Sequence, residues 1–143
     1  MIKNERQYRI TKTQIAKFEA ALKAAAARGD MASQLQKLEA DALRSQLEEL
    51  RQELKRYEAL RAGSSVPIRL DSFEQLPRAL VQARIAAGFS QKELAERLGL
   101  KEQQIQRYEA TEYASASLER IKEVLKALGV NITGELTGKN NPS

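Results

Sequence analysis

The chain contains no cysteine and no histidine among its 143 residues. The absence of both side chains excludes disulfides, thiol nucleophiles, imidazole bases and nearly every transition-metal site. We therefore expect no enzyme: no catalytic residue, no metal and no cofactor.

Tryptophan is also absent, and no run of about 18 apolar residues could span a membrane. The first ten residues are polar and lack the apolar core of a secretory signal. These absences predict a cytoplasmic protein with no membrane partner. The chain contains 42% hydrophobic and 30% charged residues, which indicates a helical protein. Its net charge of +5 favours an anionic partner such as nucleic acid.

A change of composition at residues 62–67, where small residues, a glycine and a proline interrupt helix-forming sequence, indicates a domain boundary. We predict an all-α fold with a helical hairpin over 1–62, a linker over 63–70 and a second helical domain over 71–129. Residues 130–143 are expected to form a short β-strand and a flexible tail, because apolar residues occupy alternate positions there.

Two helices are predicted in the N-terminal hairpin. An apolar stripe indicates a helix from Thr11 to Arg28, opened by a capping box of Thr11 and Gln14 and ended by Gly29-Asp30. Ser33 and Gln36 form a second capping box, which opens a helix to about Arg61. The a and d positions of a coiled-coil seam in this helix are Ala40, Leu43, Leu47, Leu50, Leu54 and Tyr57.

The role of this seam has two interpretations. The leucines either hold the two helices of one hairpin together or join two copies of the chain. Leu35 and Leu38 lie outside the register, and the seam is too short for a long rigid rod.

The second domain shows short helical patterns from residue 76 to 128, which fit five helices. Within it, Gln91–Leu98 and Glu102–Ala110 are predicted as two helices joined by a three-residue turn. Ala95 is small where these helices would cross, Gly99 suits a left-handed turn, and Ile105 points into the shared core. Ser90 with Glu93 is expected to cap the first of the two helices.

These features together resemble the DNA-binding helix-turn-helix domain of phage lambda-type repressors and the wider Xre family. The resemblance covers about residues 76–130 and predicts that 71–129 is the DNA-binding domain. It also implies that Arg84 and Glu109 form a structural ion pair between two helices. The residues that carry it are Arg84, Gly88-Phe89-Ser90-Gln91, Leu94-Ala95, Leu98-Gly99-Leu100, Ile105 and Tyr108-Glu109.

The second motif helix offers a reading face for DNA bases. If Ile105 faces inward, a rotation of 100° per residue points Gln103 and Arg107 outward, with Gln106 beside them. Glutamine can pair with adenine and arginine with guanine in the major groove. The resemblance implies base contacts for Glu102 as well as for Gln103 and Arg107.

Phosphate contacts are predicted at three further positions. The resemblance implies one for Gln91, at the N-terminus of its helix, and we expect backbone contacts from Lys101 and Gln104. One departure from the family is Ala110-Thr111-Glu112-Tyr113 in place of its usual Asn-Gly, so the helix is expected to end differently.

Double-stranded DNA is therefore the predicted partner, bound by a homodimer at a two-fold operator, and the predicted function is transcriptional repression by occupancy. The alternative is an antitoxin that neutralises a co-expressed toxin by direct binding and regulates its own operon. Residues 1–62 carry 13 basic against 9 acidic residues, and 63–143 carry 11 against 10, so phosphate contacts from the N-terminal region are also expected.

Overall fold

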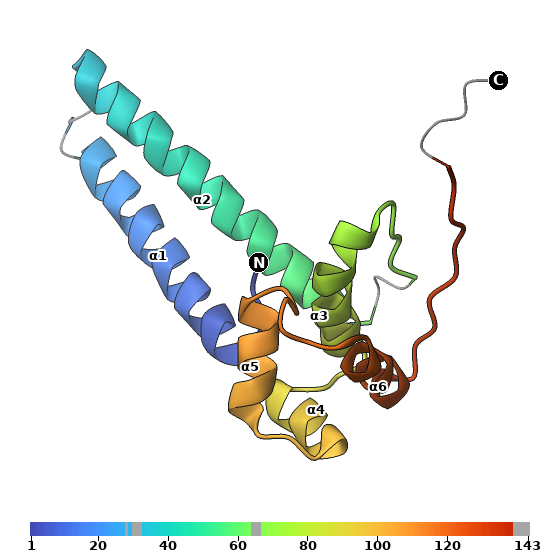
Figure 1. The fold of residues 1–143 in the computed structure, drawn as a ribbon. Coiled ribbons are helices and arrows are strands. Elements are labelled where there is room, and N and C mark those ends of the chain that lie inside the picture. The colour runs from blue at the N-terminus through green and yellow to red at the C-terminus, as the bar shows by residue number, and fades with distance from the viewer. Residues whose placement is uncertain (28, 30–32, 64–66, 139–143) are drawn as a thin grey trace.

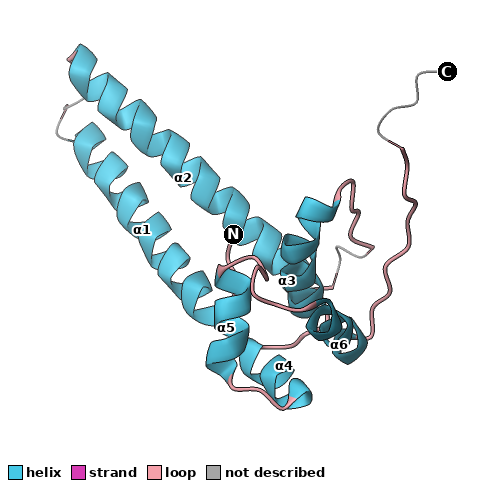
Figure 2. Cartoon of the chain, viewed as in Figure 1, coloured by secondary structure: helices cyan, strands magenta, loops and turns pink. Residues whose placement is uncertain are grey.

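The computed structural model describes residues 1–27, 29, 33–63 and 67–138, and the described residues form helices without any strand (Figure 2). Two long helices build the hairpin, and shorter ones build the second domain (Figure 1). In chain order the elements are α1 (Glu5–Ala27), α2 (Gln34–Arg61), the 3-10 turn η1 (Phe73–Gln75), α3 (Leu76–Ala86), α4 (Gln91–Leu98), α5 (Glu102–Ala110) and α6 (Leu118–Leu128). No helix in the described ranges is long and apolar enough to cross a membrane.

The hairpin consists of α1 and α2 packed antiparallel along their length (Figure 1). Leu47 and Tyr57 of the predicted seam are buried, and the ring of Tyr57 lies 5.2 Å from that of Tyr8 of α1, where Ile15 is buried as well. In a single chain the seam therefore joins the hairpin's own two helices. Leu35 and Leu38, which lie outside the register, are exposed.

The start of α1 differs from the prediction, because the helix begins at Glu5 and not at Thr11. The side chain of Asn4 accepts a hydrogen bond of 2.8 Å from the Gln7 N–H, and Gln7 Oε1 in turn accepts one of 2.8 Å from the Lys3 N–H. These bonds satisfy the first free donors of the helix. Thr11 lies inside the helix and is buried, so the capping box predicted there was wrong. The predicted end at Arg28 and the stop at Asp30 lie outside the described residues.

The predicted second capping box is formed. The hydroxyl of Ser33 accepts a hydrogen bond of 3.1 Å from the Gln36 N–H, and Gln36 Oε1 accepts one of the same length from the Ser33 N–H. The helix then runs from Gln34 to Arg61 without interruption. Local sequence signals therefore account for the start of α2.

The base of the hairpin shares an apolar core with the second domain. Val81 and Ile85 of α3 pack against the chain terminus and against both hairpin helices. The buried members of this core are Ile2, Tyr8, Tyr57, Leu60, Val81 and Ile85. Residues 64–66 of the predicted linker lie outside the described residues. The shared core joins the hairpin directly to α3.

In its described residues the second domain holds the short 3-10 helix η1 and four α-helices, but η1 precedes the span 76–128 in which five helices were predicted. Residues 111–115 form turns, and Glu112 and Tyr113 have positive φ values of 54° and 56°. A left-handed backbone interrupts a right-handed helix. The core of the domain consists of Leu76, Leu80, Leu94, Ala95, Ile105, Tyr113, Val124 and Leu128.

The predicted C-terminal strand was also wrong, because residues 130–138 run as an extended loop (Figure 2). Val130 packs on the domain core, but Ile132 is half exposed and Leu136 is fully exposed. Alternating apolar residues make a strand only where a neighbouring strand completes the hydrogen bonds of the backbone. The described part of the chain contains no such neighbour.

Candidate nucleic-acid interface

The turn between α4 and α5 is built from local signals. The hydroxyl of Ser90 caps α4 by accepting a hydrogen bond of 3.0 Å from the Glu93 N–H. Gly99 ends the helix with a φ of 69°, and the Leu100 N–H donates to the Ala95 carbonyl at 2.8 Å. This is the glycine-terminated helix end that lets the chain reverse within three residues.

Close packing then fixes the angle between the two helices. Leu94 of α4 and Ile105 of α5 are completely buried, and Ala95 is 1% exposed. Any larger side chain at Ala95 would have to displace atoms of the core. The helix α5 is therefore held rigidly, with one face in the core and the other in solvent.

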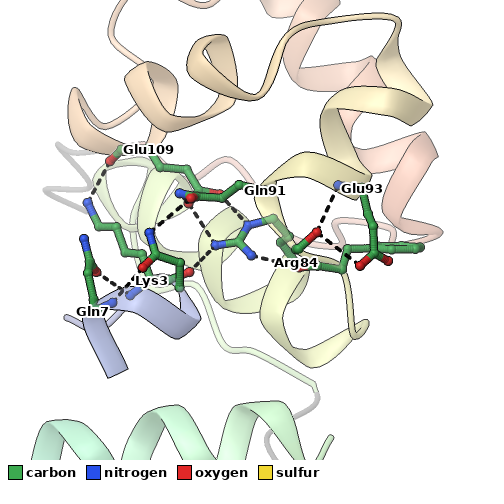
Figure 3. Close-up of polar contacts among 9 residues, drawn as sticks. Lys3, Gln7, Arg84, Gln91, Glu93 and Glu109 are labelled. Atoms are coloured by element: carbon green, nitrogen blue, oxygen red, sulfur yellow. Dashed lines mark hydrogen bonds and ion pairs between the residues drawn. The ribbon is translucent and has the colours of Figure 1, made fainter. Parts of the chain in front are cut away.

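A buried ion pair ties α5 to α3. The Arg84 Nε atom lies 2.6 Å from Glu109 Oε2, and Nη2 lies 2.9 Å from Oε1, so the contact is bidentate (Figure 3). Both side chains are almost fully buried, at 3% and 1% exposure. Arg84 also donates to the carbonyl oxygens of Phe89 and Lys3. The pair expected from the resemblance is thus present, and all of its charge is matched inside the protein.

The same network extends to the first residues of the chain (Figure 3). Gln91 Nε2 donates to Glu109 Oε1 at 2.8 Å, and Gln91 Oε1 accepts a hydrogen bond of 3.1 Å from Asn4 Nδ2. Lys3 Nζ donates to the Glu109 carbonyl at 2.9 Å. Gln91 is only 5% exposed, and its side chain makes both of these hydrogen bonds inside the protein. The predicted phosphate contact of Gln91 stays a prediction.

The outer face of α5 carries the predicted reading residues. Glu102, Gln103, Gln106 and Arg107 are all exposed. The two predicted phosphate ligands at the turn, Lys101 and Gln104, are exposed as well, and Gln104 Oε1 accepts a hydrogen bond of 3.0 Å from the Lys101 N–H. The six predicted DNA-contacting residues from Lys101 to Arg107 are thus all exposed, whereas Gln91 is buried.

A cleft of about 840 Å³ separates this surface from the start of α1. Arg6, Gln7 and Ile10 line one side of the cleft, and Glu102 and Gln106 line the other. Sequence reasoning did not place the first helix beside the reading helix. The positive charge of residues 1–62 was the only feature of the sequence that indicated this proximity, because no local motif encodes a contact between residues about a hundred positions apart.

The loop after α5 is closed by a buried tyrosine. The Tyr113 N–H donates to the Tyr108 carbonyl at 2.7 Å, and the two rings stack with centroids 5.5 Å apart. Burial raises the pKa of Tyr113, and the nearby Glu109 carboxylate adds to the effect. Tyr113 therefore packs the loop against the end of α5.

Comparison with known protein families identifies this region. The family described as Helix-turn-helix, the Xre or lambda-repressor type, matches residues 80–134. No curated protein and no solved structure matches the chain significantly. The matched residues begin in α3 and include α4, α5 and α6, the elements that position the exposed face of α5. Residues 80–134 therefore match the helix-turn-helix family of the Xre, lambda-repressor-like type, whose members are DNA-binding transcriptional regulators.

Proposed function

We propose that the protein is a transcriptional repressor that binds a two-fold DNA operator as a homodimer. The observation that carries the proposal is the outer face of α5, where Gln103 and Arg107 are exposed within a matched helix-turn-helix domain. Their side chains suit bidentate pairing with adenine and guanine, respectively. A repressor of this type acts by occupying the promoter, which requires no catalytic residue.

The roles of the individual side chains follow from their places on α5. Gln103 and Arg107 read bases at the centre of the face, with Glu102 and Gln106 contacting neighbouring base pairs. Lys101 and Gln104, at the start of the helix, contact the sugar-phosphate backbone. The buried Arg84–Glu109 pair contacts no DNA and keeps the face in position.

A dimer follows from the number of bases that one such helix can read. A single α5 covers only a few base pairs, whereas two copies related by a two-fold axis read successive major grooves about one DNA turn apart. We therefore expect a pseudo-palindromic operator with half-sites separated by about 10 base pairs or a multiple of this.

Selection of bound fragments from the source genome tests the proposal. The operator should appear as an enriched inverted repeat, and Arg107→Ala should lose about 1 to 3 kcal/mol at this site while binding random DNA almost as before. Equal losses on both DNAs would reduce Arg107 to a phosphate contact. Failure to enrich any sequence would refute specific binding.

The antitoxin alternative makes a different prediction for the same experiment. The enriched operator would then precede an operon that also encodes a toxin, and the toxin would copurify with the full chain. A repressor without this second role would bind upstream of genes of other kinds.

A further inference from the structure

We propose that the outer side of α1 is a second DNA-binding surface, which contacts the sugar-phosphate backbone beside the major groove read by α5. This inference rests on the proposed function, since it extends the DNA contact beyond the matched family domain. The surface consists of Arg6, Arg9 and Lys17, which we call the basic face of α1. It lies outside residues 80–134.

The charge of the hairpin is concentrated in its first helix. Residues 1–27 contain six lysines and arginines against two acidic residues, whereas residues 34–61 contain six of each. Most of the protein's net charge of +5 thus belongs to the first 27 residues. A patch of this sign attracts the phosphates of DNA.

The two acidic residues of α1 are each paired with an arginine of α2, although Glu5 also interacts electrostatically with Arg9. Glu5 Oε1 lies 2.6 Å from Arg61 Nη1, and Glu19 Oε1 lies 3.6 Å from Arg51 Nη2. The hydrogen bond from Arg61 lowers the pKa of Glu5, so this carboxylate stays ionised and neutralises a charge on the second helix. Arg6 and Lys17 form no ion pair within the described part of the chain.

Helical geometry places the basic face on one side. At 100° per residue, Arg6, Arg9 and Lys17 fall within about a quarter of the circumference of the helix, opposite the buried Tyr8 and Ile15. All three basic residues are exposed. Arg6 and Lys17 are separated by about 16 Å along the axis, a length over which one DNA strand passes about five phosphates.

The position of α1 relative to α5 is what makes this face relevant to DNA. Arg6 lines the cleft whose opposite side is formed by Glu102 and Gln106 of the reading face. The hydrogen bonds of Lys3 and Asn4 to Glu109 and Gln91 fix the start of α1 there. A duplex seated on α5 would therefore lie next to α1, as the close approach of the two helices in Figure 1 suggests.

The interior of the cleft is less suitable for phosphate than the outer face. Glu5, Glu93 and Glu102 line it, and Lys3, which lines it as well, already donates a hydrogen bond to the Glu109 carbonyl. The charges of Arg61 and Arg84 are already matched by Glu5 and Glu109. The proposed phosphate contacts therefore belong to the outer side of α1, with Arg6 at the cleft and Arg9 and Lys17 beyond it.

The salt dependence of binding by the full-length protein tests this inference. A triple variant, Arg6→Gln, Arg9→Gln and Lys17→Gln, removes the basic face while keeping good helix-forming residues. The matched control, Lys37→Gln, Lys55→Gln and Arg56→Gln, removes the same charge from exposed positions of α2. Affinity for a short mixed-sequence DNA duplex is measured by fluorescence anisotropy over a series of KCl concentrations.

We expect the plot of log affinity against log salt to become less steep by about 0.9 for each phosphate that the protein no longer neutralises, and only in the α1 variant. Affinity should then fall by about fivefold for each such phosphate at 0.15 M salt. Equal slopes for the two triple variants would overturn the inference while leaving the proposed function intact. If the unmodified protein fails to bind the duplex even at low salt, the proposed function itself fails. Unchanged circular dichroism in both variants verifies that the hairpin is still folded.

Discussion

Replacing Glu109 with glutamine tests whether the buried ion pair holds α5 in place. The substitution keeps the size of the side chain but removes its charge and one of the two acceptor oxygens that face Arg84. The Arg84 guanidinium then remains ionised at 3% exposure without a counter-charge. Removing one partner of a buried pair costs about 3 to 5 kcal/mol, a large share of the 5 to 15 kcal/mol that stabilises a typical domain.

The expected loss can be measured by thermal or urea unfolding. For a chain of this size, about 3 to 5 kcal/mol lowers the melting temperature on the order of 10 °C. Glu123→Gln is a matched control, because Glu123 pairs with Arg120 at 2.8 Å but on the exposed side of α6. A surface pair contributes less than about 1 kcal/mol, so this control should unfold almost like the unmodified protein.

A double variant separates the charge effect from simple loss of packing. Arg84→Met with Glu109→Leu removes both charges, which should recover part of the stability that Glu109→Gln alone loses. Recovery should be incomplete, because Gln91 and the carbonyls of Phe89 and Lys3 lose their partners. If Glu109→Gln costs no more than Glu123→Gln, the buried pair is not what holds α3 and α5 together.

Three further substitutions test local features of the fold. Glu112→Gly should raise the unfolding free energy by about 1 kcal/mol, because Glu112 has a φ of 54° that only glycine adopts without strain. An unchanged or lower melting temperature would contradict this. Gly99→Ala should lower the unfolding free energy measured in urea by about 1 to 2 kcal/mol, because a φ of 69° is unfavourable for alanine. The loss should be no larger, since an added Cβ would meet no atom within 4 Å. Complete unfolding would show that the space around the Cβ is not free. Burial raises the pKa of Tyr57 to about 12. The hydroxyl of Tyr57 therefore loses its proton from about pH 10 in the unfolded chain, while the folded protein keeps it. Stability should fall as the pH rises from about 10 to about 12. Tyr57→Phe should reduce that fall, with unfolding measured at several alkaline pH values, and an identical pH dependence in both proteins would refute the shift.

The sequence alone determined the helix-turn-helix segment. The predicted bounds Gln91–Leu98 and Glu102–Ala110 are those of α4 and α5. The signals for them are local: Ser90 caps one helix, Gly99 reverses the chain, and the burial of Ile105 follows from helical periodicity. Each of these acts within a few residues, so no knowledge of distant contacts is needed. The same holds for the capping box of Ser33 at the start of α2.

Only the tertiary structure decided how the ends of the chain are used. The helix α1 begins six residues earlier than predicted, since the start of the chain is held by Arg84, Gln91 and Glu109. The segment after Gly129 has the alternating apolar pattern of a strand but forms none, because the described residues include no neighbouring strand to which its backbone could hydrogen-bond. A sequence pattern reports which face of a segment is apolar, whereas the contacts that a segment makes depend on which distant residues the fold brings beside it. For this reason the exposed face of α5 could be predicted from sequence, and its position beside α1 could not.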